Sequence, residues 1–231
     1  MKRSEINAIM KRGIGFLRQF GFHLPAFAAW TPAEWKRKGP ECGDIARQNL
    51  GWDITDFGSG DFIRIGLFVF TIRNGTAAEA RRATGKNYAE KVMIVEEQQV
   101  TPTHFHHFKM EDIINRGGGE LAIRLWNATA GDGLARSRVK AKIDGVESEV
   151  PAGGTVYLKP GESICLPPRL YHSFWGRKGR GRVLVGEVSR VNDDHTDNRF
   201  LEPVGRFPAI EEDVPPLYLL LGDYPRYYRY L

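Results

Sequence analysis

The sequence predicts a mainly β protein, an antiparallel barrel or sandwich with helices packed outside it at the N-terminal end. From Asp61 onward, short apolar and aromatic runs alternate with glycine-rich turn signals, a pattern typical of antiparallel all-β domains. Before that point, apolar residues recur with a nearly helical period. The chain has 231 residues, 42% hydrophobic and 26% charged, a composition that fits one globular domain.

The first sixty residues are predicted to be helical. An apolar stripe from Ile6 to Leu17 indicates an amphipathic helix over residues 4–20, with Ser4 as its N-cap and Gly21 at its end. Residues 31–34, Thr-Pro-Ala-Glu, have the pattern of a capped helix start and predict a second, short helix. We expect both helices to pack on the outside of the β structure.

Seven strands are expected between Asp61 and Arg190 from apolar runs bounded by turns. They are residues 62–72, 91–96, 121–127, 138–143, 155–158, 163–166 and 182–188. We therefore predict a single domain with a helical N-terminal extension (1–60), a β-barrel (61–190) and a C-terminal extension (191–231). The tyrosine-rich end, residues 218–230, is interpreted as a packing or subunit-contact strap, or as a surface tail.

Composition excludes several classes of protein. No apolar run approaches the roughly 20 residues that a membrane-spanning helix needs, and residues 1–20 lack the apolar core of a signal peptide. We therefore expect a cytoplasmic protein without a membrane partner. Only Cys42 and Cys165 are present, too few for a disulfide framework.

The formal net charge of +5 raises the question of a polyanionic partner. The densest basic cluster lies at residues 177–182, where glycines interrupt it and no nucleic-acid motif accompanies it. We interpret this cluster as a solvated turn between strands and expect no nucleic-acid partner.

Three histidines and one glutamate predict a metal site. His104 and His106 are two residues apart, so on a strand both side chains project from one face and Phe105 from the other. Glu111 follows His106 by an odd number of residues, so a turn or bulge must redirect it. His172 must arrive from another strand. Together they form a ligand set of three imidazoles and one carboxylate.

This ligand set indicates the kind of metal and of chemistry. Mixed nitrogen and oxygen donors suit manganese, iron, cobalt, nickel or zinc rather than calcium or magnesium. A six-coordinate ion would keep two open positions, which can hold two neighbouring oxygens of one substrate. The sequence thus predicts a metalloenzyme. The remaining histidines fit this role less well: His107 alternates to the other face, and His23 stands alone.

The neighbourhoods of these ligands resemble the paired motifs of the cupin superfamily. The first motif is carried by His104, His106, Glu111 and Gly118, and the second by Gly161, Pro167 and His172. Two positions depart from the pattern: Arg169 stands where the second motif usually has glycine, and Gly176 where it usually has asparagine. The resemblance implies a cupin-type, jelly-roll-like antiparallel barrel.

A narrower resemblance covers most of the chain. Residues 51–58 (GWDITDFG), 111–119 (EDIINRGGG) and 192–200 (NDDHTDNRF) are similar to the D-lyxose isomerase family, metal-dependent cupin enzymes that interconvert an aldose and a ketose. The resemblance implies conversion of D-lyxose to D-xylulose, with D-mannose to D-fructose as a related reaction. It also implies manganese as the favoured ion and a homodimer.

Such an isomerase must move a proton between C2 and C1, which requires a base of tuned pKa. Glu187 shares a strand face with Val183 and Val185, and we interpret it as this base, with a raised pKa; the alternative is an exposed residue on the outer face. Lys109, in the turn of the metal site, is the candidate that polarises or protonates a substrate oxygen. Glu202 is the reserve candidate for acid–base catalysis.

The polar stretch after Asn192 supplies candidates for sugar binding. Asp194, Asp197 and Arg199 are predicted to bind substrate hydroxyls, and turn or lid architecture is the alternative.

Three other functions remain open. A cupin dioxygenase shares the same ligation and would require oxygen. A sugar-phosphate isomerase would need Arg177, Arg180 or Arg182 to face the pocket as a phosphate clamp. A sugar-binding cupin without catalysis would be indifferent to replacement of Lys109 or Glu187.

Overall fold

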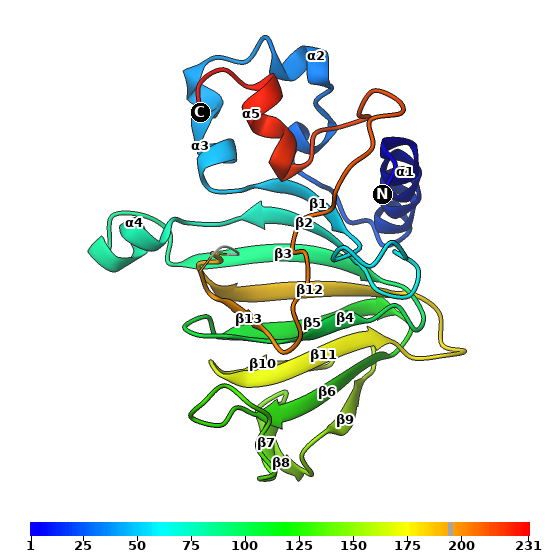
Figure 1. Cartoon of the computed structure of the whole chain (residues 1–231), viewed down its shortest axis with the longest axis vertical. Helices are drawn as coiled ribbons and strands as arrows, with labels where there is room; N and C mark the ends of the chain where they lie inside the picture. Colours follow the sequence, from blue (N-terminus) through cyan, green and yellow to red (C-terminus); the bar gives the residue numbers. More distant parts are fainter. Residues whose placement is uncertain (194–195) are drawn as a thin grey trace.

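The computed structural model describes residues 1–193 and 196–231 and shows an antiparallel β-barrel with most of its helices gathered at one end (Figure 1). The helices are α1 Arg3–Gln19, α2 Pro32–Trp35, α3 Gly43–Arg47, α4 Ala77–Arg82 and α5 Tyr224–Tyr227, with 3-10 turns η1 Ala26–Ala29, η2 Pro40–Cys42 and η3 Leu221–Asp223. The strands are β1 Gly51–Thr55, β2 Leu67–Arg73, β3 Tyr88–Val95, β4 Thr101–His106, β5 Glu111–Gly118, β6 Leu121–Asn127, β7 Val139–Ile143, β8 Val146–Val150, β9 Gly154–Leu158, β10 Ser163–Leu166, β11 Leu170–Gly176, β12 Val183–Arg190 and β13 Asn198–Phe200.

In the described part of the chain these strands form two sheets. The larger sheet has eight strands in the order β1-β2-β3-β12-β5-β10-β7-β8, and the smaller has five in the order β13-β4-β11-β6-β9. All pairings between the named strands are antiparallel. The predicted mainly β fold class, with its N-terminal helices, is therefore confirmed.

The predicted start of the β structure at residue 61 is wrong, because β1 already pairs with β2 through Trp52 and Phe70. All five residues of β1 are buried. One face of this strand meets the helical layer and the other meets the barrel interior, so the alternation of polar and apolar residues that reveals a half-exposed strand is missing.

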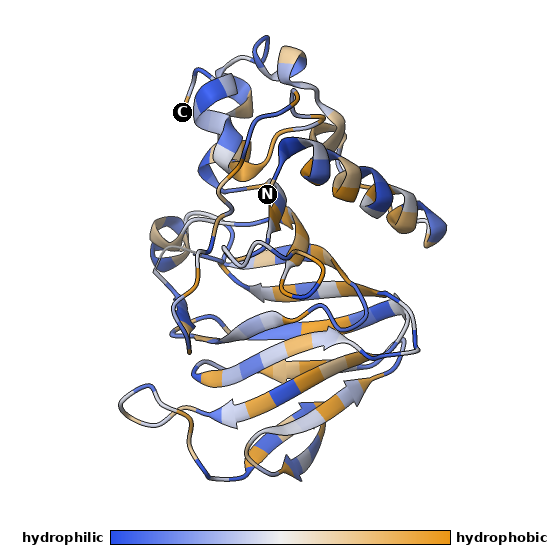
Figure 2. Ribbon diagram, turned by 45° about the vertical axis from the view of Figure 1, so that its right-hand side comes forward, coloured by the Kyte–Doolittle hydropathy of each residue, from blue (hydrophilic) through white to orange (hydrophobic). Residues whose placement is uncertain are grey.

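Helix α1 covers the outer face of the larger sheet. Its buried face consists of Ile6, Ile9, Met10, Phe16 and Leu17 and packs against Trp52, Ile54, Phe68, Phe70, Val92, Ile94 and Leu184. Figure 2 shows this one-sided hydropathy along α1. The Ser4 N-cap is wrong: Lys2 occupies that position, and Ser4 donates from its backbone N–H and hydroxyl to Asp213.

A second helical layer closes one end of the barrel. The capping box predicted at Thr31 is present, with Glu34 as its partner. The tyrosine-rich end packs against this layer, as one of our interpretations expected. Tyr224 and Tyr228 are buried, and their ring centroids lie 4.8 and 5.6 Å from that of Trp35.

The apolar core fills only part of the barrel. Side chains from β6, β7, β9 and β10 pack inside it, among them Leu121, Ile123, Leu125, Val139, Ala141, Val156, Leu158, Ile164 and Leu166. Elsewhere the interior holds a cavity, which is lined by residues of β1 to β5, β11, β12 and β13. None of the helices among the described residues has the length and apolar character needed to cross a membrane.

The packing of α1 predicts opposite effects for two glycines of this helix. A Cβ on Gly13 would overlap the ring of Phe68, whereas a Cβ on Gly15 would meet open space. Gly15→Ala should raise the free energy of unfolding by about 0.5–1 kcal/mol through helix propensity. Gly13→Ala should lower it by about 1–3 kcal/mol through overpacking. Urea unfolding measures both; equal effects would show that α1 does not pack on Phe68 as described.

Candidate active site

The three predicted histidines meet inside the barrel. His104 and His106 project from β4, and His172 lies directly opposite His104 on β11. The ring centroids of His104 and His172 are 4.2 Å apart, and those of His104 and His106 are 5.1 Å apart. All three side chains are buried. Phe105 points to the other side of the sheet, where its ring contacts Tyr171.

Glu111 joins this cluster because the chain turns before it. β4 ends at His106 and Glu111 begins β5, so the carboxylate comes from a different sheet. Its Oε1 lies 3.3 Å from Nε2 of His106 and 3.2 Å from Nε2 of His172. The structure thus contains the change of direction that the spacing of His106 and Glu111 required.

Two contacts support the ends of these strands. Asp197 accepts hydrogen bonds from the backbone N–H groups of Phe108, at 2.7 Å, and of Lys109, at 3.0 Å, and so holds the turn between β4 and β5. Arg169 precedes β11 with φ of 64°, the left-handed conformation that glycine adopts most easily. Its N–H donates to the carbonyl of His106, which ties β11 to β4 despite the missing glycine.

The imidazoles are oriented as metal ligands. Nδ1 of His104 lies 2.8 Å from the carbonyl oxygen of Pro102, and Nδ1 of His172 lies 3.0 Å from that of Leu170. Because a carbonyl oxygen only accepts, Nδ1 carries the proton in each ring and Nε2 keeps its lone pair.

The cluster fits a metal ion. One ligand nitrogen from each of the three imidazoles can be chosen so that all lie within 4.8 Å of one another. Nδ1 of His106 and Nε2 of His172 are buried without a hydrogen-bond partner among the described residues. These three histidines could therefore hold a metal ion, and the Glu111 carboxylate adjoins them.

The protonation states agree with this role. Burial lowers the pKa of His104 well below its ordinary value, and the neighbouring His172 and His106 lower it further. Burial acts against ionisation of Glu111, yet Lys109 and His106 hold the pKa of this carboxyl well below its usual range. At neutral pH the site thus offers a neutral imidazole and an ionised carboxylate, the forms that bind metals.

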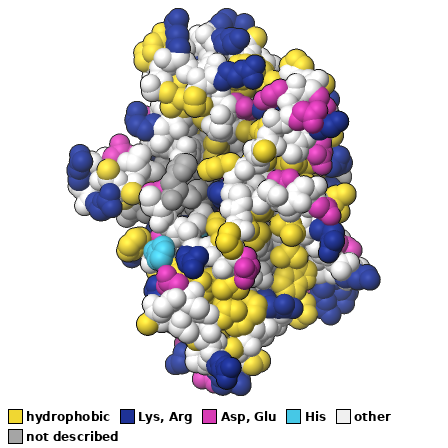
Figure 3. All heavy atoms as spheres, viewed as in Figure 1, with side chains coloured by type: hydrophobic (Ala, Val, Ile, Leu, Met, Phe, Trp, Pro, Cys, Tyr) yellow, Lys and Arg dark blue, Asp and Glu magenta, His cyan; other side chains and the backbone are white. Residues whose placement is uncertain are grey.

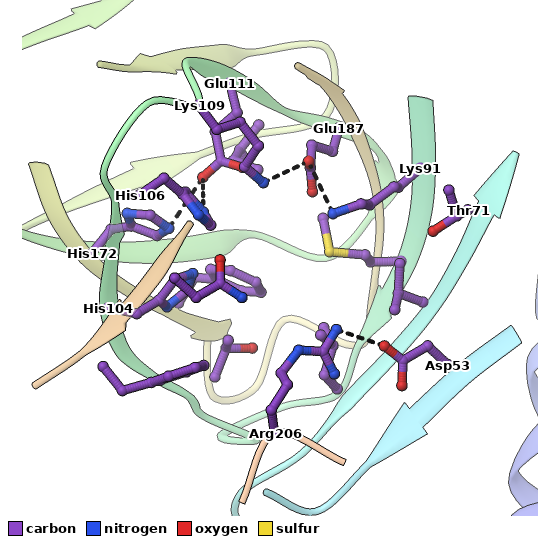
Figure 4. A pocket seen from close by; sticks show the side chains of 18 of the residues that line it. Asp53, Thr71, Lys91, His104, His106, Lys109, Glu111, His172, Glu187 and Arg206 are labelled. Carbon is purple, nitrogen blue, oxygen red and sulfur yellow. Dashed lines mark hydrogen bonds and ion pairs between the residues drawn. The ribbon is translucent and has the colours of Figure 1, made fainter. Parts of the chain in front are cut away.

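Lys109 connects the metal cluster to the second predicted catalytic residue. Its Nζ lies 2.6 Å from Glu111 Oε2, 2.9 Å from Glu187 Oε1 and 3.3 Å from Asn192 Oδ1. Figure 4 shows the contact between Lys109 and Glu187. Burial alone would lower the pKa of Lys109, but the two carboxylates outweigh it and raise the pKa above its ordinary value. The ammonium group stays charged, and an acceptor faces each of its three N–H groups.

Glu187 faces the barrel interior, but its predicted raised pKa is wrong. It lies opposite Lys91 in the pairing of β12 with β3, and the two side chains form an ion pair of 3.3 Å. Burial acts to raise the pKa of Glu187, but Lys109 and Lys91 more than offset this and lower it. The carboxylate is ionised at neutral pH.

These groups line a cavity with about 570 Å³ of empty space, its open mouth included. The metal cluster forms one side, and the Asp53–Arg206 ion pair forms another (Figure 4). The remaining lining residues are Phe57, Leu67, Val69, Thr71, Lys91, Met93, Thr101, Lys109, Ile113, Phe174, Glu187, Asn198 and Phe200.

The sequence reasoning missed Lys91, Asp53 and Arg206. Lys91 had a usable signal, since it begins a predicted strand and shares a face with Met93 and Val95. Asp53 lies in the unrecognised strand β1. Arg206 lies outside any helix or strand, so no periodic pattern indicates where its side chain points.

Several predicted residues lie elsewhere. Glu202 and Arg199 are exposed and are not among the described residues that line the cavity. Arg199 lies between Asn198 and Phe200 on β13, and because side chains alternate along a strand, these two face the cavity and Arg199 faces away. Asp197 holds the turn instead of lining the cavity. Asp194 lies outside the described residues.

The proposed phosphate clamp also lies outside the cavity. Arg177 and Arg180 pair with Glu120, and Arg182 pairs with Glu96 at 3.3 Å. On the face of the molecule in Figure 3, acidic and basic side chains are interspersed.

The hydrogen bonds of Asp197 predict a large loss of stability when its carboxylate is removed. Asp197→Ala should lower the free energy of unfolding by about 1–3 kcal/mol, because two backbone N–H groups lose their acceptor. Exposed Glu202 is the control, and Glu202→Ala should change the free energy of unfolding by less than about 0.5 kcal/mol. Urea unfolding curves that coincide for the two variants would contradict this role of Asp197.

Comparison with known proteins identifies the family of this chain. A model of the D-lyxose isomerase family matches residues 1–224. The D-lyxose/D-mannose isomerase of Serratia proteamaculans is 51% identical over 228 residues, which cover 98% of this chain and 99% of that protein. The protein of the same name from Escherichia coli O157:H7 is 48% identical, with coverage of 98% and 100%.

Solved structures of L-ribose isomerases share the fold. The enzyme from Cellulomonas parahominis, solved with L-ribose, has a TM-score of 0.60 at 18% identity, covering 91% of this chain and 98% of that one. The Acinetobacter sp. DL28 enzyme has a TM-score of 0.61 at 16% identity, with the same coverage. With a family model over nearly its whole length and relatives about half identical, the chain belongs to the D-lyxose isomerase family and is an aldose–ketose isomerase.

Proposed function

We propose that this protein interconverts D-lyxose and D-xylulose, with D-mannose and D-fructose as a second pair, in a reaction that depends on a divalent metal ion. The names of the two relatives support the choice of sugars. The ion would be held by His104, His106, Glu111 and His172. Manganese is our first choice because the resemblance to the D-lyxose isomerase family implies it; the mixed nitrogen and oxygen donor set also suits cobalt, nickel, iron and zinc.

One observation carries this proposal: the four candidate ligands and an ionised carboxylate, Glu187, face the same small cavity. Aldose–ketose isomerisation shifts one proton between neighbouring carbons while negative charge develops on their oxygens. It therefore needs a base and a centre of positive charge side by side. A bound divalent ion would supply Lewis acidity toward the sugar oxygens.

Glu187 is the proposed base. It is ionised, buried and attached to strand β12, so it can take a proton from C2 of the open-chain aldose and return it to C1, while the hydroxyl proton of O2 passes to O1. One carboxylate can serve both carbons because they are adjacent. The reserve candidate Glu202 is exposed, which leaves Glu187 as the carboxylate suited to this step.

The role that we had predicted for Lys109, to polarise or protonate a substrate oxygen, we now propose for Lys91. Each donor of Lys109 faces an acceptor of the protein, so we propose that it positions Glu111 and Glu187 and keeps both ionised. Lys91 also lines the cavity and contacts Glu187 and Asn192. We propose that its ammonium group donates a hydrogen bond to a sugar oxygen.

Removal of the metal is the decisive experiment for the function. Dialysis against a chelator should abolish interconversion of D-lyxose and D-xylulose, and Mn²⁺ should restore it more fully than other divalent ions. The thermal midpoint should rise when Mn²⁺ is added, because the ion binds only the folded state. His172→Gln should weaken both responses. Full turnover by protein shown to be free of metal by elemental analysis would refute metal dependence.

Replacement of the proposed base separates catalysis from metal binding. Glu187→Gln should lower kcat by about 10²- to 10⁴-fold, the usual contribution of a general base, while Mn²⁺ affinity stays nearly unchanged. Glu202→Gln is the matched control and should leave kcat within about twofold. A Glu187→Gln enzyme with normal kcat would sink the assignment.

The same assays decide between the rival functions. A dioxygenase would lose activity under anaerobic conditions, whereas an isomerase would not. A sugar-phosphate isomerase would prefer the phosphorylated ketose to D-xylulose. A binding protein would take up D-lyxose and produce no D-xylulose with any ion.

A further inference from the structure

The cavity has a charged pair on a wall that the proposed chemistry does not use. Arg206 Nη2 donates to Asp53 Oδ2 at 2.6 Å, and both residues line the cavity. In Figure 4 they lie across the cavity from Glu111, Lys109 and Glu187. Asp53 is 5% exposed. Its direct neighbour across the strands, Val69, is apolar and lines the cavity beside it.

Stability does not explain this pair. Taking two charges out of water costs free energy that their attraction only partly repays, so apolar residues of similar volume would serve the fold at least as well. Much of the cavity lining is apolar, with Phe57, Leu67, Val69 and Met93 among its residues, and Thr71 of β2 adds a hydroxyl group. An ion pair that lines the cavity, with Asp53 buried and Arg206 largely so, therefore indicates a role in binding.

Both partners are held in place from outside the cavity. Asp53 belongs to β1, whose neighbouring residues Trp52 and Ile54 pack under α1. Next to Arg206, the N–H of Gly205 donates to the carbonyl of Phe57 at 3.1 Å. Further along the same segment, Ala209 accepts a hydrogen bond from the N-terminal amino group. The pair thus presents a carboxylate and a guanidinium group in a fixed arrangement.

We propose that Asp53 and Arg206 form the subsite that binds the terminal hydroxyl of the sugar, at the end of the chain remote from C1 and C2. The inference rests on the proposed function, since it requires the reacting carbons to lie at the metal cluster. A hydroxyl group both donates and accepts, so it can donate to Asp53 and accept from Arg206. The pair carries no net charge, which favours a neutral polyol over a phosphate, because Asp53 would repel an anion.

Pairing each variant with each substrate tests this subsite in the manganese-loaded enzyme. The wild type should use D-lyxose better than 5-deoxy-D-lyxose, which lacks the terminal hydroxyl, by about 10- to 100-fold in kcat/KM, the usual range for a hydrogen bond to a charged group. In Asp53→Asn and in Arg206→Gln this ratio should fall to about threefold or less. The exposed Arg229 provides the control: Arg229→Gln should keep the wild-type ratio.

A role confined to folding predicts a different result, in which both sugars lose the same factor and the ratio is unchanged. That result, in variants whose thermal unfolding shows them to be folded, would overturn the proposal. Asp53→Asn preserves shape, and the Asp53→Asn/Arg206→Gln double variant leaves no unpaired charge, so one of the three variants should fold. Stronger binding of D-xylulose 5-phosphate than of D-xylulose would equally overturn it.

The experiment also separates this inference from the proposed function. Calorimetric binding of D-lyxose and 5-deoxy-D-lyxose to Glu187→Gln enzyme measures the same ratio without turnover. If the preference for D-lyxose over 5-deoxy-D-lyxose is lost in the Asp53 and Arg206 variants, the subsite is supported even where the wild type fails to isomerise D-lyxose. A wild type that isomerises D-lyxose while its variants keep the ratio refutes the subsite alone.

Discussion

The ammonium group of Lys109, placed between Glu111 and Glu187, is the interaction on which the cavity depends. The two carboxylates project from neighbouring strands into a buried space, where desolvation and mutual repulsion both favour their neutral forms. Lys109 reverses this preference at both positions, and Lys91 assists at Glu187. A protonated Glu111 would be a poor metal ligand, and a protonated Glu187 could not accept a proton. One cation therefore maintains the state that both proposed roles require.

This cation depends in turn on the far end of the chain. Asp197 holds the turn that carries Lys109, β13 extends the smaller sheet beside β4, and Arg206 contributes to the cavity wall. The segment that we predicted as a C-terminal extension is thus part of the site. Its terminal tyrosines then pack against the N-terminal helices, so both ends of the chain close the same end of the barrel (Figure 1).

The comparisons show a fold that is shared with L-ribose isomerases. L-ribose isomerases share the architecture at below a fifth identity, so this barrel accommodates much sequence change. The chemistry proposed here needs the ligand cluster, the adjoining Lys109–Glu187 pair and Lys91. The Asp53–Arg206 wall is made from other strands and segments, which allows the choice of sugar to vary separately from the reaction.

The sequence by itself determined the features that depend on local spacing. Period-two alternation places His104 and His106 on one face, and the odd spacing to Glu111 requires a turn. Short apolar runs between glycines predict an antiparallel barrel or sandwich. Lys109 was recognisable for the same reason, since it lies in that turn. Only the tertiary structure decided the partners. The lowered pKa of Glu187 follows from its contact with Lys109 and from its register opposite Lys91. Asp53 meets Arg206 although 153 positions separate them. Glu202 and Arg199 are excluded from the cavity wall by the direction in which the chain crosses the barrel. Register and crossing direction arise from packing over the whole molecule, and no local pattern of residues encodes them.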